Sequence, residues 1–461
     1  MSIKKNNTEL SYMILITVIA ALGGTLFGYD QGVISGALNF FSVHFKLSQA
    51  TVGFVSGVLA LGAMAGCLLA GFASDRLGRK KIMLCAGILF TLSSLILAIS
   101  PSVEILIVGR ILSGVAIGMA STIVPLYISE VAPAKIRGTL VSANQLAFAI
   151  GMTSVFIVNA IIANTHSIGF NVLLGWRFMF ASGMVPAVIF FGLSFIIPES
   201  PRFLIKIGKD AQALSILTRI NGDEIAKKES LEIKKSISSS KKGLISELAA
   251  PGIRYAFLIA ILAAIFQQLT GTIAVGYYAP TIFKMTGVGI NASLIETIGI
   301  GVIKIIFVAI FMFYIDKVGR KKLLRNGAYS MVVALLFLSF LFHLGKFNNV
   351  IDILILLGVL AHTAAYELSW GGGAWVILSE IFPTSIRGRA LSFSSMAMFL
   401  TSYFVTQFFP IMLSKIGASL TFGIFAVFCI LMGLFASIML PETTGKSLEQ
   451  IELDFKVKGM N

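Results

Sequence analysis

Apolar stretches of about 20 residues recur along almost the whole chain, and they constrain its fold more than any other feature. A helix of that length can cross the ~30 Å hydrocarbon core of a bilayer. Lipid tolerates only helices and closed barrels, so this pattern predicts an all-α protein that crosses the membrane many times. We expect about twelve spans, at residues 12–41, 50–74, 82–100, 105–128, 140–163, 176–197, 255–283, 294–315, 323–344, 351–380, 390–413 and 420–440.

The composition excludes the main soluble alternatives. Hydrophobic residues make up 57% of the chain and charged residues 12%, whereas a soluble domain carries about 25% charged residues. The net charge is +15, yet long stretches carry no charge, so the basic residues do not form the polar surface that a nucleic-acid partner requires. We therefore expect a lipid bilayer as partner and no nucleic acid.

Lys and Arg residues gather in alternate connections between the spans, at 76–81, 135–137, 317–325 and 387–389. Because such loops stay in the cytoplasm, both termini are expected there. The first span is longer than a cleaved signal sequence and contains Asp30, so we expect it to remain in the protein. A short first external loop favours a multi-pass protein of the bacterial inner (plasma) membrane.

The two halves of the chain repeat one another. The motif Asp75-Arg-Leu-Gly-Arg-Lys-Lys81 returns about 240 residues later as Asp316-Lys-Val-Gly-Arg-Lys-Lys322, and two more motif pairs keep nearly the same spacing. These pairs begin at Ser129 and Ser379, and at Pro198 and Pro441. Duplication predicts two six-helix bundles, 1–200 and 251–461, joined by a polar cytoplasmic helical linker at 201–250.

Two charged side chains of the first half are predicted to meet inside the membrane. At 1.5 Å per residue, Asp30 lies about 16 Å from the outer end of its span and Arg110 about 8 to 12 Å from the outer end of its own. Buried charges are costly and rarely kept without a use. Protonation of Asp30 would release Arg110 and loosen the helix contact, which is how a proton can be coupled to a conformational change. The alternative is a permanent ion pair that only holds the bundle together.

Several further motifs identify a family that the whole chain resembles. They are Pro198-Glu-Ser-Pro-Arg202, Gln267-Gln-Leu-Thr-Gly271, Tyr277-Tyr278 and Pro441-Glu-Thr-Thr-Gly445. With the motif at 75–81, they resemble the sugar porters of the major facilitator superfamily, which include bacterial sugar–proton symporters and facilitative glucose transporters. The resemblance implies a monomeric secondary active transporter that carries a sugar or polyol with protons by alternating access. The four histidines show no metal-ligand spacing and no nucleotide-binding loop is present, so we expect no enzyme, no metal site and no cofactor beyond the coupling proton.

The resemblance also implies roles for particular residues. Asp30, in Gly28-Tyr29-Asp30, matches the proton acceptor and Arg110 its partner. A sugar site needs amide side chains that both donate and accept hydrogen bonds, and it needs an aromatic ring on which the sugar can stack. The matching positions are Gln145, Gln267, Gln268, Tyr277 and Trp375. Trp375 follows Gly371-Gly-Gly373, where we expect an unwound helix.

Other family positions depart from the pattern. Polar residues of the family are replaced here by Met152, Ile273, Lys304, Met398 and Phe399, and a carboxylate found on the sixth helix of some symporters is Gly183. Lys304 lies near mid-membrane, where it either pairs with Glu367 or Glu296 or attracts an anionic substrate. Two alternatives therefore stand beside a neutral-sugar symporter: a proton-coupled transporter of a sugar acid and a non-transporting sugar sensor.

The repeated charged motifs are interpreted as a cytoplasmic gate. A carboxylate beside Gly and several Lys or Arg can pair with neighbouring helix ends and hold one conformation closed. We expect Glu130 to pair with Arg137, and Glu380 with Arg387. The remaining gating candidates are Asp75, Arg79, Asp316 and Arg320 in these motifs, and Glu367, which is expected deep in the membrane. The lysines are interpreted as topology anchors only.

Overall fold

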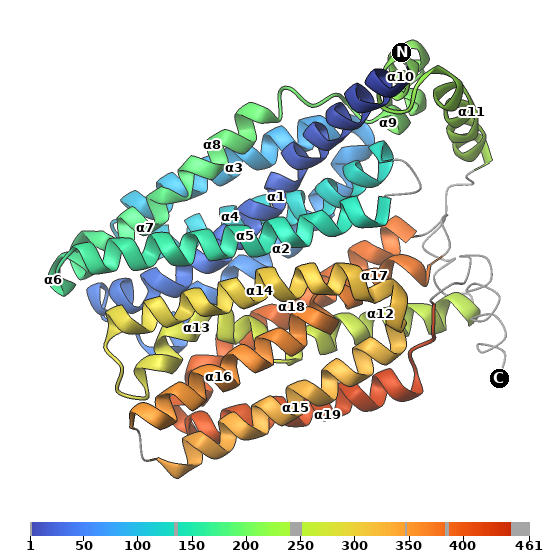
Figure 1. Cartoon of the computed structure of the whole chain (residues 1–461). Helices are drawn as coiled ribbons and strands as arrows, with labels where there is room; N and C mark the ends of the chain where they lie inside the picture. Colours follow the sequence, from blue (N-terminus) through green and yellow to red (C-terminus); the bar gives the residue numbers. More distant parts are fainter. Residues whose placement is uncertain (1, 133–136, 240–250, 346–347, 383–386, 444–461) are drawn as a thin grey trace.

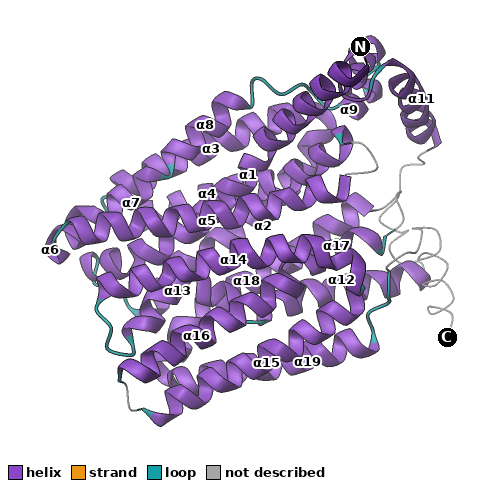
Figure 2. Cartoon of the chain, in the orientation of Figure 1, coloured by secondary structure: helices purple, strands orange, loops and turns teal. Residues whose placement is uncertain are grey.

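The structure is a computed structural model that describes residues 2–132, 137–239, 251–345, 348–382 and 387–443. Within these ranges every regular element is a helix, and the rest is loop and turn (Figure 2). Twelve segments of the described chain are long and apolar enough to cross a membrane. This confirms the predicted all-α membrane fold and its number of spans.

The first six spans form one bundle, blue to green in Figure 1. They are α1 (Ser2–His44), α2 (Gln49–Leu77), α3 (Arg79–Ile99), α4 (Val103–Val131), α5 (Arg137–Thr165) and a sixth span made of α6 (Ile168–Phe170), η1 (Asn171–Gly175), α7 (Trp176–Ser182) and α8 (Met184–Leu193). Three helices follow: α9 (Pro201–Lys206), α10 (Asp210–Asn221) and α11 (Asp223–Ser239). They lie at one end of the molecule, here called the linker end.

The last six spans form a second bundle beside the first, yellow to red in Figure 1. They are α12 (Pro251–Leu269) with α13 (Thr272–Lys284), α14 (Ile290–Val318), α15 (Arg320–Leu344), α16 (Asn349–Tyr366) with η3 (Glu367–Gly371) and α17 (Gly372–Glu380), α18 (Arg387–Lys415), and α19 (Gly417–Ile438). Between the bundles, α2 packs along α18 and α5 along α14.

Three spans differ from the predictions. The sixth begins at Ile168 rather than at residue 176, because α6 and the π-turn η1 extend it. The seventh divides between α12 and α13 at Gly271, whose φ of 79° is a left-handed conformation that favours glycine. In the tenth, the chain before Gly372 is not unwound. It forms the π-helix η3, a local widening that is frequent at functional sites.

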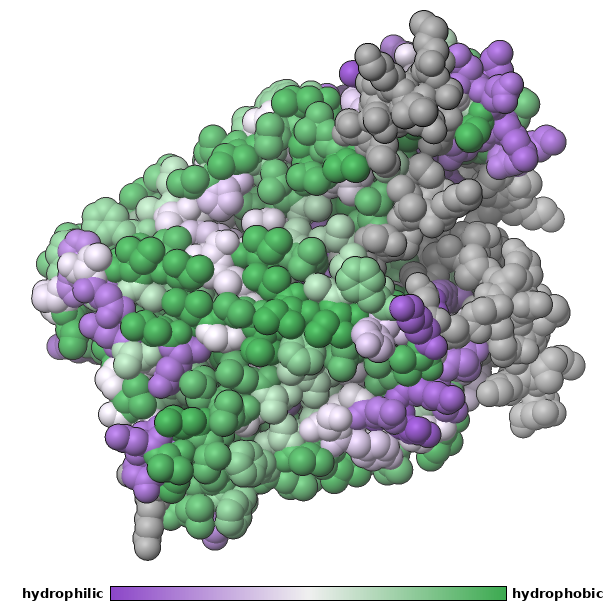
Figure 3. All heavy atoms as spheres, in the orientation of Figure 1, coloured by the Kyte–Doolittle hydropathy of each residue, from purple (hydrophilic) through white to green (hydrophobic). Residues whose placement is uncertain are grey.

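Large apolar side chains cover the outside of both bundles. Phe72, Phe313, Val333 and Ile438 are each exposed by at least 70%. Figure 3 shows a broad hydrophobic surface over the spanning helices, with hydrophilic residues gathered toward the two ends. In water such a surface would promote aggregation, but in a bilayer it is the exterior expected for helices that face lipid.

Candidate functional site

Asp30 and Arg110 meet in the first bundle, as their depths along α1 and α4 predicted. Nη1 of Arg110 lies 3.0 Å from Oδ2 of Asp30, and the arginine is 0% exposed. The Ser113 hydroxyl donates to Oδ1 of Asp30 at 2.7 Å, and Nη2 of Arg110 donates to the Ser56 carbonyl at 3.4 Å. One carboxylate therefore connects α1 to α4, and its arginine extends the contact to α2.

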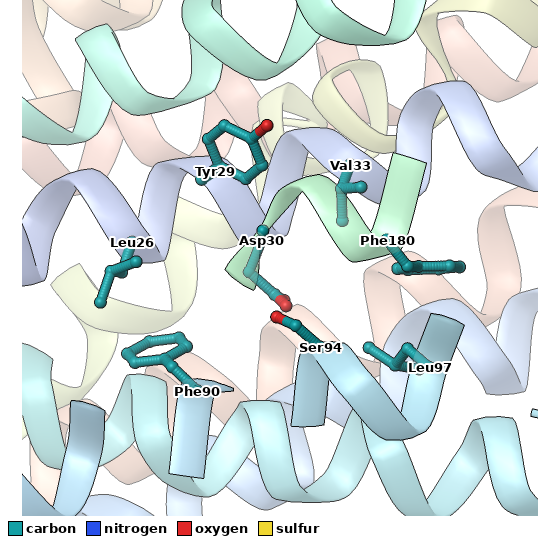
Figure 4. Close-up of a pocket in the computed structure, with 9 residues that line it drawn as sticks. Leu26, Tyr29, Asp30, Val33, Phe90, Ser94, Leu97 and Phe180 are labelled. Carbon is teal, nitrogen blue, oxygen red and sulfur yellow. The ribbon is translucent and has the colours of Figure 1, made fainter. Parts of the chain in front are cut away.

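A cavity of about 10 Å³ borders the Asp30 carboxylate. In Figure 4, Asp30 of α1 and Ser94 of α3 point toward one another across this space, with apolar side chains around them. Its lining residues are Leu26, Tyr29, Asp30, Val33, Phe90, Ser94, Leu97, Phe180 and Gly183. The volume is about the minimum that holds one water molecule. Gly183 also lines this cavity. It is the position at which the resemblance implies a carboxylate in some symporters of the family.

Two of the three predicted amides, Gln145 and Gln267, converge on one backbone segment. Nε2 of Gln267 donates to the carbonyls of Trp370 and Gly371 at 3.0 and 3.2 Å. Nε2 of Gln145 donates to the same Gly371 carbonyl at 3.1 Å. Gln145 belongs to α5 of the first bundle and Gly371 to η3 of the second, so this hydrogen bond crosses the bundle interface.

The other predicted substrate residues lie around this interface. Gln268 and Tyr277 are buried. Tyr277 of α13 is close enough to Arg110 and Asp30 to interact with their charges. Trp375 is half-buried and packs against the apolar cluster of the first bundle. Phe399 joins the same cluster, with its ring centroid 6.4 Å from that of Phe27. The site is thus built from amides of both bundles and an apolar wall.

Lys304 forms an ion pair with Glu367, one of the two partners considered from the sequence. Both side chains are less than 10% exposed. Lys304 comes from α14, and Glu367 is the first residue of η3. Glu367 therefore lies in mid-membrane, as predicted, and apart from the charged motifs at the linker end. The paired ammonium is already neutralised and offers no free charge to an anion.

The charged motifs form a network inside each bundle. In the first, Nε and Nη2 of Arg79 bind the two oxygens of Glu130 at 3.0 and 2.8 Å. Nη1 of Arg79 donates to the Ser74 carbonyl at 3.0 Å and lies 3.7 Å from Oδ1 of Asp75. Oε1 of Glu199 accepts from the backbone N–H groups of Arg79 and Lys80 at 2.9 and 3.2 Å. A carboxylate in that position satisfies the unpaired donors at the start of α3.

The second bundle repeats this arrangement. Nη2 of Arg320 donates to Glu380 at 3.1 Å, and Glu442 accepts from the backbone N–H of Arg320 at 3.0 Å. Gly78 and Gly319 precede the two arginines with φ of 93°, so the same glycine turn leads into α3 and α15. The duplicated sequence therefore builds the same network in both bundles.

The networks give the two predicted gating glutamates partners in the described part of the chain. Glu130 pairs with Arg79 inside the first bundle, and Glu380 pairs with Arg320 inside the second. The predicted partners Arg137 and Arg387, and the predicted gating residue Asp316, have side chains outside the described part of the chain. The contact of Arg79 with Glu130 is bidentate, because the planar fork of the guanidinium matches both carboxylate oxygens.

Sequence reasoning missed several partners. The acceptors Glu199 and Glu442 lie in the repeated motifs that begin at Pro198 and Pro441. The equal position of a glutamate in both motifs was the signal that could have identified them. The Ser200 hydroxyl donates to Glu130, and the Thr443 hydroxyl donates to Glu380 at 2.6 Å. Nothing in the sequence pointed to the Gly371 carbonyl as the acceptor of two glutamines.

At the end opposite the linker, the bundles touch through further hydrogen bonds. Thr281 of α13 donates to Oδ1 of Asn39 in α1 at 3.4 Å. Nε2 of Gln407 in α18 donates to the Ala50 carbonyl of α2 at 2.9 Å. A pocket of about 190 Å³ lies between the same four helices, with Leu38 and Tyr278 among its lining residues. In the described residues, no group of three or more His, Cys, Asp or Glu side chains is placed to hold a metal ion.

Comparison with known proteins gives matches along nearly the whole chain. The family model described as "Sugar (and other) transporter" matches residues 16–455. The arabinose-proton symporter of Bacillus subtilis is 41% identical over 444 residues, which cover 96% of this chain and 95% of that protein. The D-xylose-proton symporter of Escherichia coli is 36% identical over 474 aligned positions, covering 96% and 95%.

Solved structures give the same result. The proton:xylose symporter XylE bound to 6-bromo-6-deoxy-D-glucose superposes with a TM-score of 0.83 at 35% identity, covering 97% of this chain and 100% of that one. A partially occluded inward-open conformation of the xylose transporter XylE from E. coli gives a TM-score of 0.85 at 35% identity, covering 95% and 100%.

Proposed function

The chain belongs to the sugar porter family of the major facilitator superfamily, and from that premise we propose that it carries a neutral sugar across the membrane together with protons by alternating access. It is a transporter and not an enzyme. The observation that carries the proposal is the buried Asp30–Arg110 pair, because an ion pair at membrane depth is the kind of group whose protonation changes a helix contact. The basic loops support a cytoplasmic location for the linker end.

The proton step follows from the contacts of Asp30. When the carboxylate takes up a proton, it keeps the hydroxyl of Ser113 within reach but no longer neutralises Arg110. A buried guanidinium without a counter-charge is strongly unfavourable. Nε of Arg110 has no hydrogen-bond partner among the described residues, and Tyr277 of the other bundle lies nearby. We infer that protonation redirects Arg110 and thereby changes the contact between α4 and α13.

The substrate side of the proposal rests on the amides. Gln145, Gln267 and Gln268 supply donors and acceptors for hydroxyls, and Trp375 supplies an aromatic face. The ion pair of Lys304 with Glu367 favours a neutral sugar over a sugar acid, because no free cation remains to attract an anion. Arabinose and xylose, the sugars named for the two symporter relatives, are the first to test.

Uptake into proteoliposomes tests this function. With an inward proton gradient, we expect the protein to accumulate radiolabelled arabinose, xylose or glucose, and a protonophore to abolish the accumulation. Galacturonate and glucuronate serve as anionic controls and are not expected to accumulate. Accumulation of the acids alone would indicate that Lys304 contacts an anionic substrate. Transport of neither the neutral sugars nor the acids would favour a non-transporting sensor.

The paired networks at the linker end give a second prediction. Glu130→Gln removes the bidentate partner of Arg79, and Glu380→Gln removes the matched contact of Arg320. Each substitution is expected to move the equilibrium toward the state open at the linker end. Electron-paramagnetic-resonance distances between spin labels at Lys81→Cys and Lys322→Cys would measure the shift.

The control for this experiment is Lys206→Gln, which removes the solvent-exposed contact of Lys206 with Asp75 at 3.1 Å. Exposed ion pairs contribute about 0–1 kcal/mol, so the distances should stay as they are. A gating role for Glu130 and Glu380 would be excluded by distributions that match the unmodified protein in both variants.

A further inference from the structure

The Lys304–Glu367 pair has no part in the proton step, although its side chains are as deeply buried as Asp30. A buried ion pair is weak evidence for stability, because well-packed apolar residues often serve as well. The surroundings of Glu367 indicate a more specific use. Glu367 and Gly371 are the first and last residues of the π-helix η3, so the carboxylate can fold back over the turn that it begins.

The carboxylate does fold back over that turn. Its Oε1 binds the ammonium of Lys304. Its Oε2 lies 2.6 Å from where a Cβ on residue 371 would stand, closer than real Cβ contacts allow. Glycine at this position therefore admits the carboxylate against the backbone. The Glu367 carboxylate therefore connects the Lys304 ammonium to the backbone of Gly371.

The Gly371 carbonyl accepts the hydrogen bond that joins the two bundles. Gln145 of α5 donates to Gly371 at 3.1 Å, and Gln267 of α12 donates to it at 3.2 Å. The neighbouring Trp370 is 0% exposed, and its indole N–H donates to the Leu324 carbonyl at 2.8 Å. The turn is thus fixed to α15 on one side and to α14 through the ion pair on the other.

We propose that Lys304 and Glu367 are positioning residues that hold the Gly371 carbonyl as a latch between the two bundles, and that this latch competes with the substrate for the amides of Gln145 and Gln267. The competition rests on the proposed function, whereas the latch itself does not. An amide nitrogen has two N–H donors, and Gln267 directs both to the carbonyls of Trp370 and Gly371. Its Oε1 is buried without a hydrogen-bond partner among the described residues, ready for a hydroxyl donor. A sugar hydroxyl that accepts from Gln267 must therefore displace a carbonyl, and one that accepts from the N–H that Gln145 donates to Gly371 must displace that carbonyl.

The decisive variant neutralises the pair without leaving a lone charge. In Lys304→Met with Glu367→Gln, the carboxylate no longer holds the turn, so the latch weakens and sugar binding tightens by about fivefold, the factor expected for loss of one competing hydrogen bond. Equilibrium binding of radiolabelled arabinose, xylose and glucose to the purified protein measures the change. In a Gln145→Leu background the same double substitution should give a smaller gain, because the crossing bond is already absent and only the bonds of Gln267 to the turn remain to compete.

A matched control is the neutralisation of an exposed ion pair, Lys234→Met with Asp210→Asn, whose atoms lie 2.7 Å apart on the linker helices. It should leave sugar affinity as it is. An equal gain in both Gln145 backgrounds, or no gain in either, would overturn the latch, since a merely structural pair changes stability and not the competition. If the double variant does not fold, Glu367→Asp keeps the charge but withdraws the carboxylate from Gly371, and it carries the same expectation.

A second measurement separates failure of the latch from failure of the proposed function. With spin labels at Lys81→Cys and Lys322→Cys, and serine in place of the native cysteines, the sugar-free distance distribution should broaden in the Lys304→Met, Glu367→Gln variant. If the unmodified protein binds none of the three sugars but the distances change, the latch stands and the sugar assignment fails. Unchanged distances would overturn the latch whatever the protein carries.

Discussion

Replacement of Asp30 by Asn is expected to abolish uphill sugar accumulation while sparing exchange of sugar down its own gradient. An inward gradient of two pH units can drive about a hundredfold accumulation at one proton per sugar. Asn is close in shape to Asp and can still accept from Ser113, whose hydroxyl lies 2.7 Å from the carboxylate. It cannot take up and release the proton, so the accumulation ratio should fall to about one.

Two controls make this result specific. Counterflow in vesicles preloaded with unlabelled sugar shows that the Asp30→Asn protein is folded and can alternate between its states. Ser113→Ala removes the neighbouring hydrogen bond but leaves the ion pair of Asp30 with Arg110, so it should weaken accumulation without abolishing it. Protonophore-sensitive accumulation that persists in Asp30→Asn would show that another group carries the proton.

Sequence periodicity and helix geometry predicted the meeting of Asp30 with Arg110 because both depend on one dimension, the depth of a residue along its span. The same reasoning predicted twelve spans, because hydropathy over about 20 residues is a strong and local signal. The duplication predicted two bundles, since a motif that repeats must form similar structure twice. These features required no knowledge of side-chain rotation.

Partner choice was harder to predict because it depends on rotation about the helix axis and on irregular turns. The predicted partner of Glu130, Arg137, has a side chain outside the described residues, and the sequence did not indicate that Arg79 at the start of α3 contacts both oxygens of Glu130. Gln145 and Gln267 were identified as amides without their acceptor, because the π-helix that presents the Gly371 carbonyl leaves no clear sequence pattern. Lys304 had two possible partners, and only the fold distinguishes them.

Loss of either partner of the Lys304–Glu367 pair is expected to destabilise the protein more than the other single changes considered for the second bundle. Lys304→Asn leaves the Glu367 carboxylate buried without its cation, and breaking a buried pair in this way costs about 3–5 kcal/mol. Glu367→Gln leaves the opposite charge alone and should cost a similar amount. Thermal unfolding of the purified protein in detergent, followed by intrinsic tryptophan fluorescence, measures both effects.

The double substitution Lys304→Met with Glu367→Gln should recover most of that stability, since no unpaired charge remains. Lys322→Asn, at an exposed lysine near the start of α15, is the control and should unfold with the unmodified protein. A folded Lys304→Asn protein with unchanged thermal stability and increased uptake of neutral sugar would contradict the ion-pair interpretation. Lys304 would then be a residue that selects the substrate, because an asparagine there would restore the amide that the family pattern has and this chain lacks.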